Sequence, residues 1–277
     1  MYAAVFRGVP DQISNIALWG SHRRFVVARM GSTGSTWLAH LLNSHPDVAA
    51  THEQILARVF PKRSYNSDDL VQLIRLMATD TMHGAYLAAG DVGSVWAPHL
   101  LALRGKFTTA LLVRHPARSL NTRLRTYPSD QSFTEIPTWV PGVVRELWDI
   151  DTEKMSPLDR IFVLDLATFA AQSCLLGRVD AVLRIEDLQE LEYCRDALWR
   201  LTGLRYPAML IVRASHQRVN TRTPRGTTIR EILSGFTPSQ RHWYYTMLRD
   251  AAPLFEYDLD EDGAAAPRAP RFALHRT

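Results

Sequence analysis

The chain has 277 residues, of which 46% are hydrophobic and 22% are charged, enough apolar sequence for one compact α/β domain with a substantial core. Its 32 basic and 28 acidic residues leave a net charge of +4. That small excess is compatible with an anionic ligand and excludes the dense basic surface of a nucleic-acid-binding protein.

The first informative stretch covers residues 25–53. The apolar run Phe25–Ala28 predicts a buried parallel strand, and Gly31–Gly34 is a turn of small residues. Residues 35–42 predict a helix with its leucines on one face. A strand, a glycine turn and a helix N-terminus aim several backbone N–H groups at one point, which favours an anion such as phosphate. The alternative is a connection that binds nothing.

Hydroxyl side chains surround Gly34, and they can donate to phosphate oxygens. They are Ser32, Thr33, Ser35 and Thr36. The nucleotide-binding pattern G-x-x-x-x-G-K-[ST] fails here, because Ser35 replaces its lysine and Arg29 replaces its first glycine. The loop therefore disfavours an ATPase or kinase.

His52 and Glu53 follow soon after this helix. Glu53 can act as a general base if it faces the anion site, and His52 is a rival for the same role. Taken without their context, both are ordinary solvated loop residues. Further along, residues 67–78 predict a helix, 91–96 a short strand and 98–103 another helix.

A second buried strand is predicted at residues 108–113, followed by Arg114 and a helix over 117–125. Thr122 lies eight residues after Arg114. The carboxyl ends of parallel strands form the crevice where α/β folds bind ligands, so both side chains are candidates for anion binding. The alternative for Arg114 alone is a surface salt bridge.

Residues 127–157 contain several prolines and two tryptophans, and we interpret them as an irregular cap over an acceptor site or as a structural excursion. Residues 158–177 predict a helix, 180–185 a strand, and 189–201 a helix that Gly203 ends. The basic stretch 216–235 includes Arg225 and Gly226, which either close over a ligand or form a solvated loop. Thr237 and Pro238 open a last helix, and the tail 260–277 has no packing pattern.

Cysteine content and hydropathy set further limits. Cys174 and Cys194 form neither a disulfide framework nor a metal site, and we expect both to be buried in helices. No run approaches the roughly 20 apolar residues of a membrane span, and the N-terminus has no signal-peptide pattern. We therefore expect a cytoplasmic protein, with a bacterial source, that binds no nucleic acid.

Two segments together carry a family resemblance. Ser32 to Trp37, STGSTW, resembles the 5'-phosphosulfate loop of sulfotransferases that use 3'-phosphoadenosine-5'-phosphosulfate (PAPS). Residues 41–48, LLNSHPDV, together with Glu53, look like the tyrosylprotein and bacterial branch. Arg114 to Thr122 resembles the 3'-phosphate motif. Ser32 departs from the usual Lys or Arg, and Thr122 from the commoner Ser.

The resemblance implies a fold and a set of roles. The fold is a three-layer α/β/α domain with a central parallel sheet, like P-loop NTPases, spanning residues 1–277. PAPS is the sulfuryl donor, Trp37 packs near its adenine, and Arg225 with Gly226 closes over it. Glu53 takes the proton of the acceptor hydroxyl, and no metal is needed. The segment 184–188, RIEDL, is architectural in the family.

Several questions stay open at this stage. The acceptor is a small molecule, a carbohydrate or a peptide, and a homodimer is compatible with the family. The cation that the loop lacks at Ser32 could come from Arg29, Lys62 or Arg63. The alternative functions are an ATP-dependent P-loop phosphotransferase and a degenerate nucleotide-binding protein.

Overall fold

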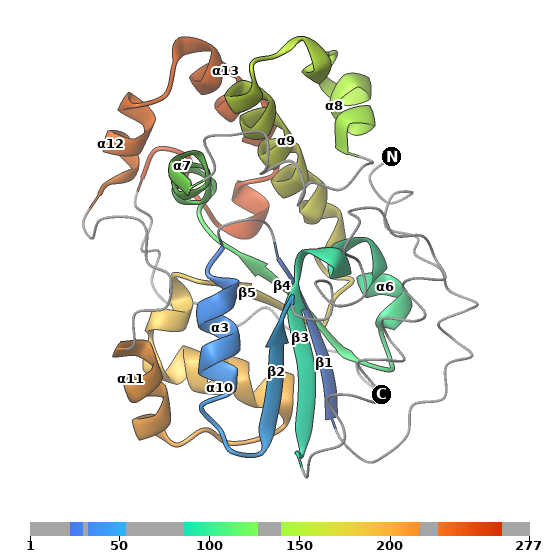
Figure 1. Ribbon diagram of the computed structural model, residues 1–277, viewed down its shortest axis with the longest axis vertical. Coiled ribbons are helices and arrows are strands. Elements are labelled where there is room, and N and C mark those ends of the chain that lie inside the picture. The colour runs from blue at the N-terminus through green and yellow to red at the C-terminus, as the bar shows by residue number, and fades with distance from the viewer. Residues whose placement is uncertain (1–22, 30–32, 54–85, 127–139, 217–226, 262–277) are drawn as a thin grey trace.

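The computed structural model describes residues 23–29, 33–53, 86–126, 140–216 and 227–261 (Figure 1). Its centre is a five-stranded sheet in the order β2-β3-β1-β4-β5. Every neighbouring pair is parallel. The strands are β1 (Arg23–Arg29), β2 (Val48–His52), β3 (Ala88–Gly93), β4 (Thr108–Val113) and β5 (Ala181–Arg184). The first strand thus lies in the middle, with its carboxyl end between those of β3 and β4.

Helices cover both faces of the sheet. They are α3 (Ser35–Leu42), α6 (Leu100–Leu103), α7 (Pro116–Thr126), α8 (Val140–Trp148), α9 (Pro157–Gln172), α10 (Leu191–Thr202), α11 (Ala208–His216), α12 (Ile229–Ser234) and α13 (Pro238–Leu248). Short 3-10 turns are η1 (Ser94–His99), η3 (Thr152–Lys154), η4 (Ser173–Leu175), η5 (Asp187–Gln189) and η6 (Pro253–Phe255). Figure 1 shows α3, α10 and α11 gathered on one side of the strands.

The alternation of side chains along β1 divides the core in two. Phe25 and Val27 pack with the helices α3, α10 and α11, whereas Val26 and Ala28 pack with α9 and α13 on the other face. All four side chains are fully buried. A strand that is apolar on both faces is typical of a parallel sheet between two helical layers. The expected three-layer α/β/α fold with a central parallel sheet is confirmed.

The strands predicted at residues 25–28 and 108–113 are present as β1 and β4. The one predicted at 91–96 is partly wrong, because β3 runs from Ala88 to Gly93 and the chain then enters η1. Gly90 explains part of the difference. A Cβ there would lie 2.2 Å from the Phe25 carbonyl oxygen, so the close approach of β3 to β1 requires glycine, a residue that gives little strand signal in the sequence.

The helices predicted at residues 35–42, 117–125, 158–177 and 189–201 are present as α3, α7, α9 and α10, and the predicted last helix is present as α13. Thr237 and Gln240 form a capping box at the start of α13, and Gly203 ends α10 with a φ of 75°. Residues 140–148 form α8 instead of an irregular cap, because its apolar face is buried. The helices α11 and α12 and the strand β2 were not predicted. Cys194 is buried as expected and Cys174 is half-buried.

Two predicted elements fall outside the described residues: the helix at 67–78 and most of the tail after 260. None of the helices that the structure describes has the length and apolar character needed to cross a membrane.

Candidate anion-binding and catalytic site

The two turns that the sequence singles out lie at the same edge of the sheet. Their strands β1 and β4 are neighbours in parallel register, with Arg29 opposite Leu112. The chain leaves β1 for α3 through the turn at Gly34, and it leaves β4 for α7 through Arg114 and His115. The strand β2 delivers His52 to this edge and Glu53 follows it directly. Residues from distant parts of the sequence are thereby brought to one crevice.

The turn after β1 is built from small and hydroxyl residues. Gly34 caps α3 in the left-handed conformation, with φ 85° and ψ 21° and no side-chain hydrogen bond to the helix. A Cβ at this position would lie 3.1 Å from two carbons of Ile185, so glycine is needed for both conformation and space. Thr33 and Ser35 are nearly fully buried. Ser32, the position that departs from the family pattern, lies outside the described residues.

His52 contacts this turn directly. Its Nε2 lies 2.8 Å from Ser35 Oγ and 3.5 Å from Thr36 Oγ1. An imidazole at hydrogen-bond distance from two loop hydroxyls can fix their orientation or exchange a proton with them. The sequence named His52 only as a rival to Glu53 for the role of general base, and the structure adds that its ring faces the loop.

Glu53 is held by two other segments of the site. Its Oε2 forms an ion pair with Arg29 Nη2 at 2.6 Å, and its Oε1 accepts hydrogen bonds from the Ser94 N–H at 3.0 Å and the Ser94 hydroxyl at 2.7 Å. Burial raises the pKa of this carboxyl, but Arg29, the two bonds from Ser94 and nearby His52 together lower the pKa below its usual value. Glu53 is therefore a carboxylate at neutral pH.

The Glu53 backbone has a φ of 50°, in the left-handed region that residues with a Cβ seldom occupy. Such a conformation persists only where the surroundings enforce it, and it is common at functional sites. Arg29 has a side chain only 5% exposed. Of the three residues considered for the missing loop cation, Arg29 is thus committed to Glu53, while Lys62 and Arg63 lie outside the described residues.

Asp91, which the sequence did not single out, lies behind Glu53. It accepts a hydrogen bond from the Trp96 indole at 2.6 Å and another from the Thr51 hydroxyl at 2.5 Å. Burial, with a smaller contribution from the neighbouring Glu53 carboxylate, raises the pKa of Asp91 to about 6, although its two hydrogen bonds oppose the rise. An acidic residue within an otherwise apolar strand was the only sequence signal for it.

The turn after β4 is cationic. Arg114 Nη1 donates to Thr122 Oγ1 at 3.4 Å, and the Thr122 hydroxyl donates to the Arg118 carbonyl at 2.9 Å. Burial lowers the pKa of Arg114; Glu186 and Tyr257 oppose this, whereas Arg118 adds to it. Arg114 comes just before α7 and Arg118 lies in its first turn, so their like charges repel each other and an anion between them would relieve that cost. Arg118 was missed because it occupies a position that the family motif leaves unspecified.

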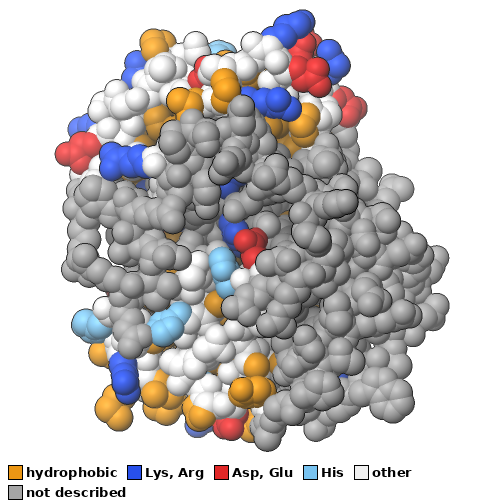
Figure 2. All heavy atoms as spheres, viewed as in Figure 1, with side chains coloured by type: hydrophobic (Ala, Val, Ile, Leu, Met, Phe, Trp, Pro, Cys, Tyr) orange, Lys and Arg blue, Asp and Glu red, His pale blue; other side chains and the backbone are white. Residues whose placement is uncertain are grey.

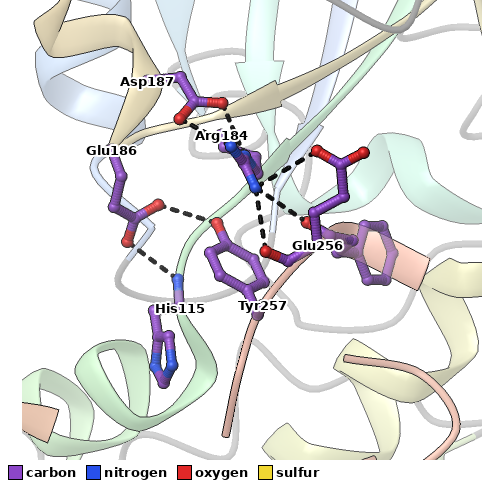
Figure 3. Close-up of polar contacts among 7 residues, drawn as sticks. His115, Arg184, Glu186, Asp187, Glu256 and Tyr257 are labelled. Atoms are coloured by element: carbon purple, nitrogen blue, oxygen red, sulfur yellow. Dashed lines mark hydrogen bonds and ion pairs between the residues drawn. The ribbon is translucent and has the colours of Figure 1, made fainter. Parts of the chain in front are cut away.

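A hydrogen-bond network anchors this second turn (Figure 3). Glu186 accepts from the His115 N–H at 3.0 Å and from the Tyr257 hydroxyl at 2.8 Å. Arg184 donates two hydrogen bonds to the Asp187 carboxylate, at 2.6 and 2.9 Å, and another to the Glu256 carbonyl at 3.1 Å. The segment 184–188 thus has the architectural role expected of it.

The remaining predicted residues have mixed outcomes. Trp37, a residue of α3, is half-buried and packs against the core on that face of the sheet. Arg225 and Gly226 are outside the described residues, but Thr227 follows them directly and its carbonyl accepts a hydrogen bond from Arg118 at 3.2 Å. Thr227 therefore lies beside the first turn of α7. Figure 2 shows Lys or Arg, acidic and His side chains close together in the middle of the face it presents.

Comparison with known proteins gives limited similarity. No family model and no curated protein matches the sequence. Among solved structures, a sulfotransferase from Alicyclobacillus acidocaldarius is similar over 90% of this chain and 100% of its own, with 14% identity and a TM-score of 0.47. The mouse sulfotransferase SULT7A1 complexed with PAP is similar over 90% of this chain and 94% of its own, with 12% identity and a TM-score of 0.43. The chain is thus similar in fold to two sulfotransferase structures, at a level that assigns no residue a role.

Proposed function

We propose that this protein is a sulfotransferase that moves a sulfuryl group from PAPS to an acceptor hydroxyl. The observation that carries the proposal is the position of the two turns. The turn at Gly34 and the turn at Arg114 follow neighbouring parallel strands, so they open onto the same edge of the sheet. A nucleotide with a phosphate at each end of its ribose is a ligand that both could hold together.

The two turns are suited to different anions. The backbone N–H groups of residues 33–36, with the Ser35 and Thr36 hydroxyls, fit the 5'-phosphosulfate group, because a helix N-terminus stabilises negative charge. Arg114, supported by Arg118 and Thr122, fits the 3'-phosphate, since guanidinium groups bind phosphate through two parallel hydrogen bonds. When bound, PAPS supplies the activated sulfuryl group.

Glu53 is our candidate for the base that takes the acceptor's proton. Arg29 and Ser94 keep it ionised and hold its orientation, as catalysis by positioning requires. The same contacts make it a weak base, because a lowered pKa reduces the driving force for proton transfer. His52, at 2.8 Å from Ser35 Oγ, is the second candidate and can also stabilise developing charge at the loop.

The acceptor that we propose is a hydroxyl of a small molecule, a carbohydrate or a peptide. We propose no metal in the reaction, since transfer of this kind depends on position and on charge stabilisation.

A second candidate function is a nucleotide-binding protein without turnover. The ion pair between Arg29 and Glu53 favours it, because that pair engages both a cation and the proposed base. Both proposed functions require the same nucleotide ligand, but only the sulfotransferase turns it over.

Thermal unfolding of the full chain with 3',5'-ADP or with ATP and Mg²⁺ tests the proposed ligand. A ligand of the folded state at 100 times its dissociation constant adds about 2.7 kcal/mol of stability. We expect stabilisation by 3',5'-ADP only; stabilisation by ATP and Mg²⁺ alone would instead favour a phosphotransferase. Radiolabelled PAPS, offered with phenols, sugars and peptides, then separates an enzyme from a binding protein.

A further inference from the structure

Asp91 bonds to both chain segments that form the contact between Glu53 and Ser94. It lies in β3, and its side chain reaches one residue of β2 and one of η1. In β2 the partner is Thr51, two residues before Glu53. In η1 the partner is Trp96, two residues after Ser94. The strands β2 and β3 are parallel neighbours with Thr51 opposite Asp91, so one carboxylate reaches both segments (Figure 1).

Each oxygen of the Asp91 carboxylate serves one segment. The Thr51 hydroxyl donates to Oδ1 at 2.5 Å, and the Trp96 indole donates to Oδ2 at 2.6 Å. Hydrogen bonds to a charged acceptor are shorter and stronger than those between neutral groups. Gly93 leaves room for this arrangement, because a Cβ there would lie 2.8 Å from Asp91 Oδ2 and 3.3 Å from Trp96 Nε1.

The other side of the contact depends on where these two segments lie. Ser94 is the first residue of η1, and it donates both its N–H and its hydroxyl to Glu53 Oε1. Glu53 directly follows β2 and has a φ of 50°, a conformation that its surroundings must enforce. The two donors of Ser94 therefore meet one Glu53 oxygen only while the end of β2 and the start of η1 keep their relative position.

Asp91 does not serve the stability of the fold at neutral pH. Its side chain is buried, and since its pKa is raised to about 6, the ionised form lowers stability at pH 7. A buried acid that is unfavourable for folding and lies behind a candidate base is typical of a functional site.

We propose that Asp91 is a positioning residue for Glu53: by bonding to Thr51 and Trp96 it holds the Glu53 carboxylate and its Ser94 donors in one geometry. The part of this inference that concerns catalysis rests on the proposed function, in which Glu53 is the base. Asp91 contacts no substrate in this proposal and acts only through Glu53.

Carbon-13 NMR of the full chain, with labelled glutamate carboxyl groups, measures the Glu53 pKa without any substrate. The Glu53 signal is the one that Glu53→Gln removes. Asp91→Ala should move its titration to higher pH, because a displaced Ser94 stabilises the charged form less. A role through charge alone predicts no such rise, since Asp91 is already protonated at the acid pH where Glu53 titrates.

Asp91→Asn is the conservative variant. Its amide oxygen can accept from the Trp96 indole, and its NH₂ group can donate to the Thr51 hydroxyl, which has the Gly90 carbonyl at 3.4 Å as its own acceptor. The Glu53 titration should therefore stay at its wild-type position in Asp91→Asn.

Thr51→Val removes one of the two bonds with little change of shape, and it should raise the Glu53 pKa in the same direction as Asp91→Ala. Thr109→Val is the matched control. It also removes a hydroxyl that donates to an aspartate on a neighbouring segment, here Asp180 at 2.9 Å near the start of β4. The Glu53 titration should be unchanged in Thr109→Val.

Turnover of radiolabelled PAPS with the same phenols, sugars and peptides, at about pH 8, gives the second readout. Asp91→Ala should lower kcat by about tenfold or more and leave KM for PAPS within about threefold, because the two turns are untouched. In a Glu53→Gln background, Asp91→Ala should cost no more than about a further twofold, since nothing is left to position.

The proposal is overturned if Asp91→Ala and Thr51→Val leave the Glu53 titration as in wild type, or if Asp91→Ala lowers turnover equally with and without Glu53. Thermal unfolding checks that each variant is folded, and Thr51→Val decides the question if Asp91→Ala is not. Wild type without turnover but with the expected titration shifts would reject sulfuryl transfer and support the positioning of Glu53 by Asp91.

Discussion

The turn after β1 and the turn after β4 offer different groups to an anion. The first offers backbone N–H groups and hydroxyls, and the nearest described arginine, Arg29, is paired with Glu53. The second offers Arg114 and Arg118, backed by the buried bonds of Glu186. The first turn therefore lies beside the groups that can carry out chemistry, whereas the second is built to hold charge.

This difference predicts how the two regions respond to mutation. Mutations near the first turn should act mainly on turnover, because His52 lies 2.8 Å from the Ser35 hydroxyl and directly precedes the candidate base Glu53. Damage to the second should act mainly on nucleotide affinity and on stability, because its charged residues form part of the packing between β4, β5 and the segment after η6.

The largest expected effect follows Glu53→Gln. This change removes the proposed base, and turnover should fall at least about a hundredfold, the lower bound for loss of a general base. It also leaves Arg29 buried without its carboxylate, so the melting temperature should fall. Steady-state assays and titration with 3',5'-ADP measure the two effects separately.

His52→Gln is the matched control for that experiment, since it removes the rival base from the adjacent position. If affinity for 3',5'-ADP and turnover fall equally in Glu53→Gln, Glu53 has no part in the chemistry. If only His52→Gln loses turnover, the two roles are exchanged.

Arg114→Ala should have the next largest effect. A hydrogen bond to a charged group contributes about 1.5–3 kcal/mol, so affinity for 3',5'-ADP should fall by about 10- to 100-fold. Calorimetric titration measures this directly. Arg125→Ala removes an exposed arginine from α7, the helix that follows Arg114, and should change affinity little. Unchanged affinity in Arg114→Ala would exclude it from the site.

Asp91 should make the first region sensitive to pH. Its pKa is raised from 3.8 when unfolded to about 6 when folded, so its contribution to stability is fully present below about pH 3.8 and is lost as pH rises through 6. At 1.36 kcal/mol per unit, the change is on the order of 2–3 kcal/mol. Denaturant titrations from pH 4 to pH 7 should show it in wild type.

Asp91→Asn is the comparison for this prediction. The amide can still accept from the Trp96 indole and donate to Thr51, so the variant should fold, and its stability should change less than that of wild type over this interval. Parallel curves for the two proteins would show that Asp91 titrates normally.

The smallest effect should follow Tyr257→Phe in the second region. It removes one hydrogen bond to Glu186 and leaves the ring in place, so the free energy of unfolding should fall by about 1–2 kcal/mol. Tyr245→Phe is the control, because the Tyr245 hydroxyl bonds to Asp260 at an exposed position. Equal losses in both variants would mean that the buried network adds nothing specific to the stability of this turn.

The sequence was informative where one physical signal dominated. The buried strands β1 and β4 are continuous apolar runs, and both follow the pattern of a parallel sheet. The start of α13 was readable because Thr237 and Pro238 are an N-cap and a first-turn residue. The strand β2 has the sequence VAATH, in which alanines and histidine have little strand propensity, so tertiary pairing with β3 decides its conformation.

The sequence indicated which residues form the candidate site, but it did not indicate which side chains they bond to. The family resemblance indicated Glu53 as the base, with His52 as its rival, and the end of the predicted strand placed Arg114 at the edge of the sheet. Contacts between distant segments have no local signal. Ser94 is 41 residues from Glu53, and Tyr257 is 71 residues from Glu186, yet these bonds decide the charge and rigidity of the site. Only the folded chain brings these residues together.

The most direct test of the account is an experimental structure of the full chain with 3',5'-ADP bound. We predict the 5'-phosphate against the backbone N–H groups of residues 33–36 and the 3'-phosphate against Arg114 and Thr122, with one nucleotide spanning both turns. A nucleotide bound elsewhere, or one that contacts only one of the two turns, would contradict it.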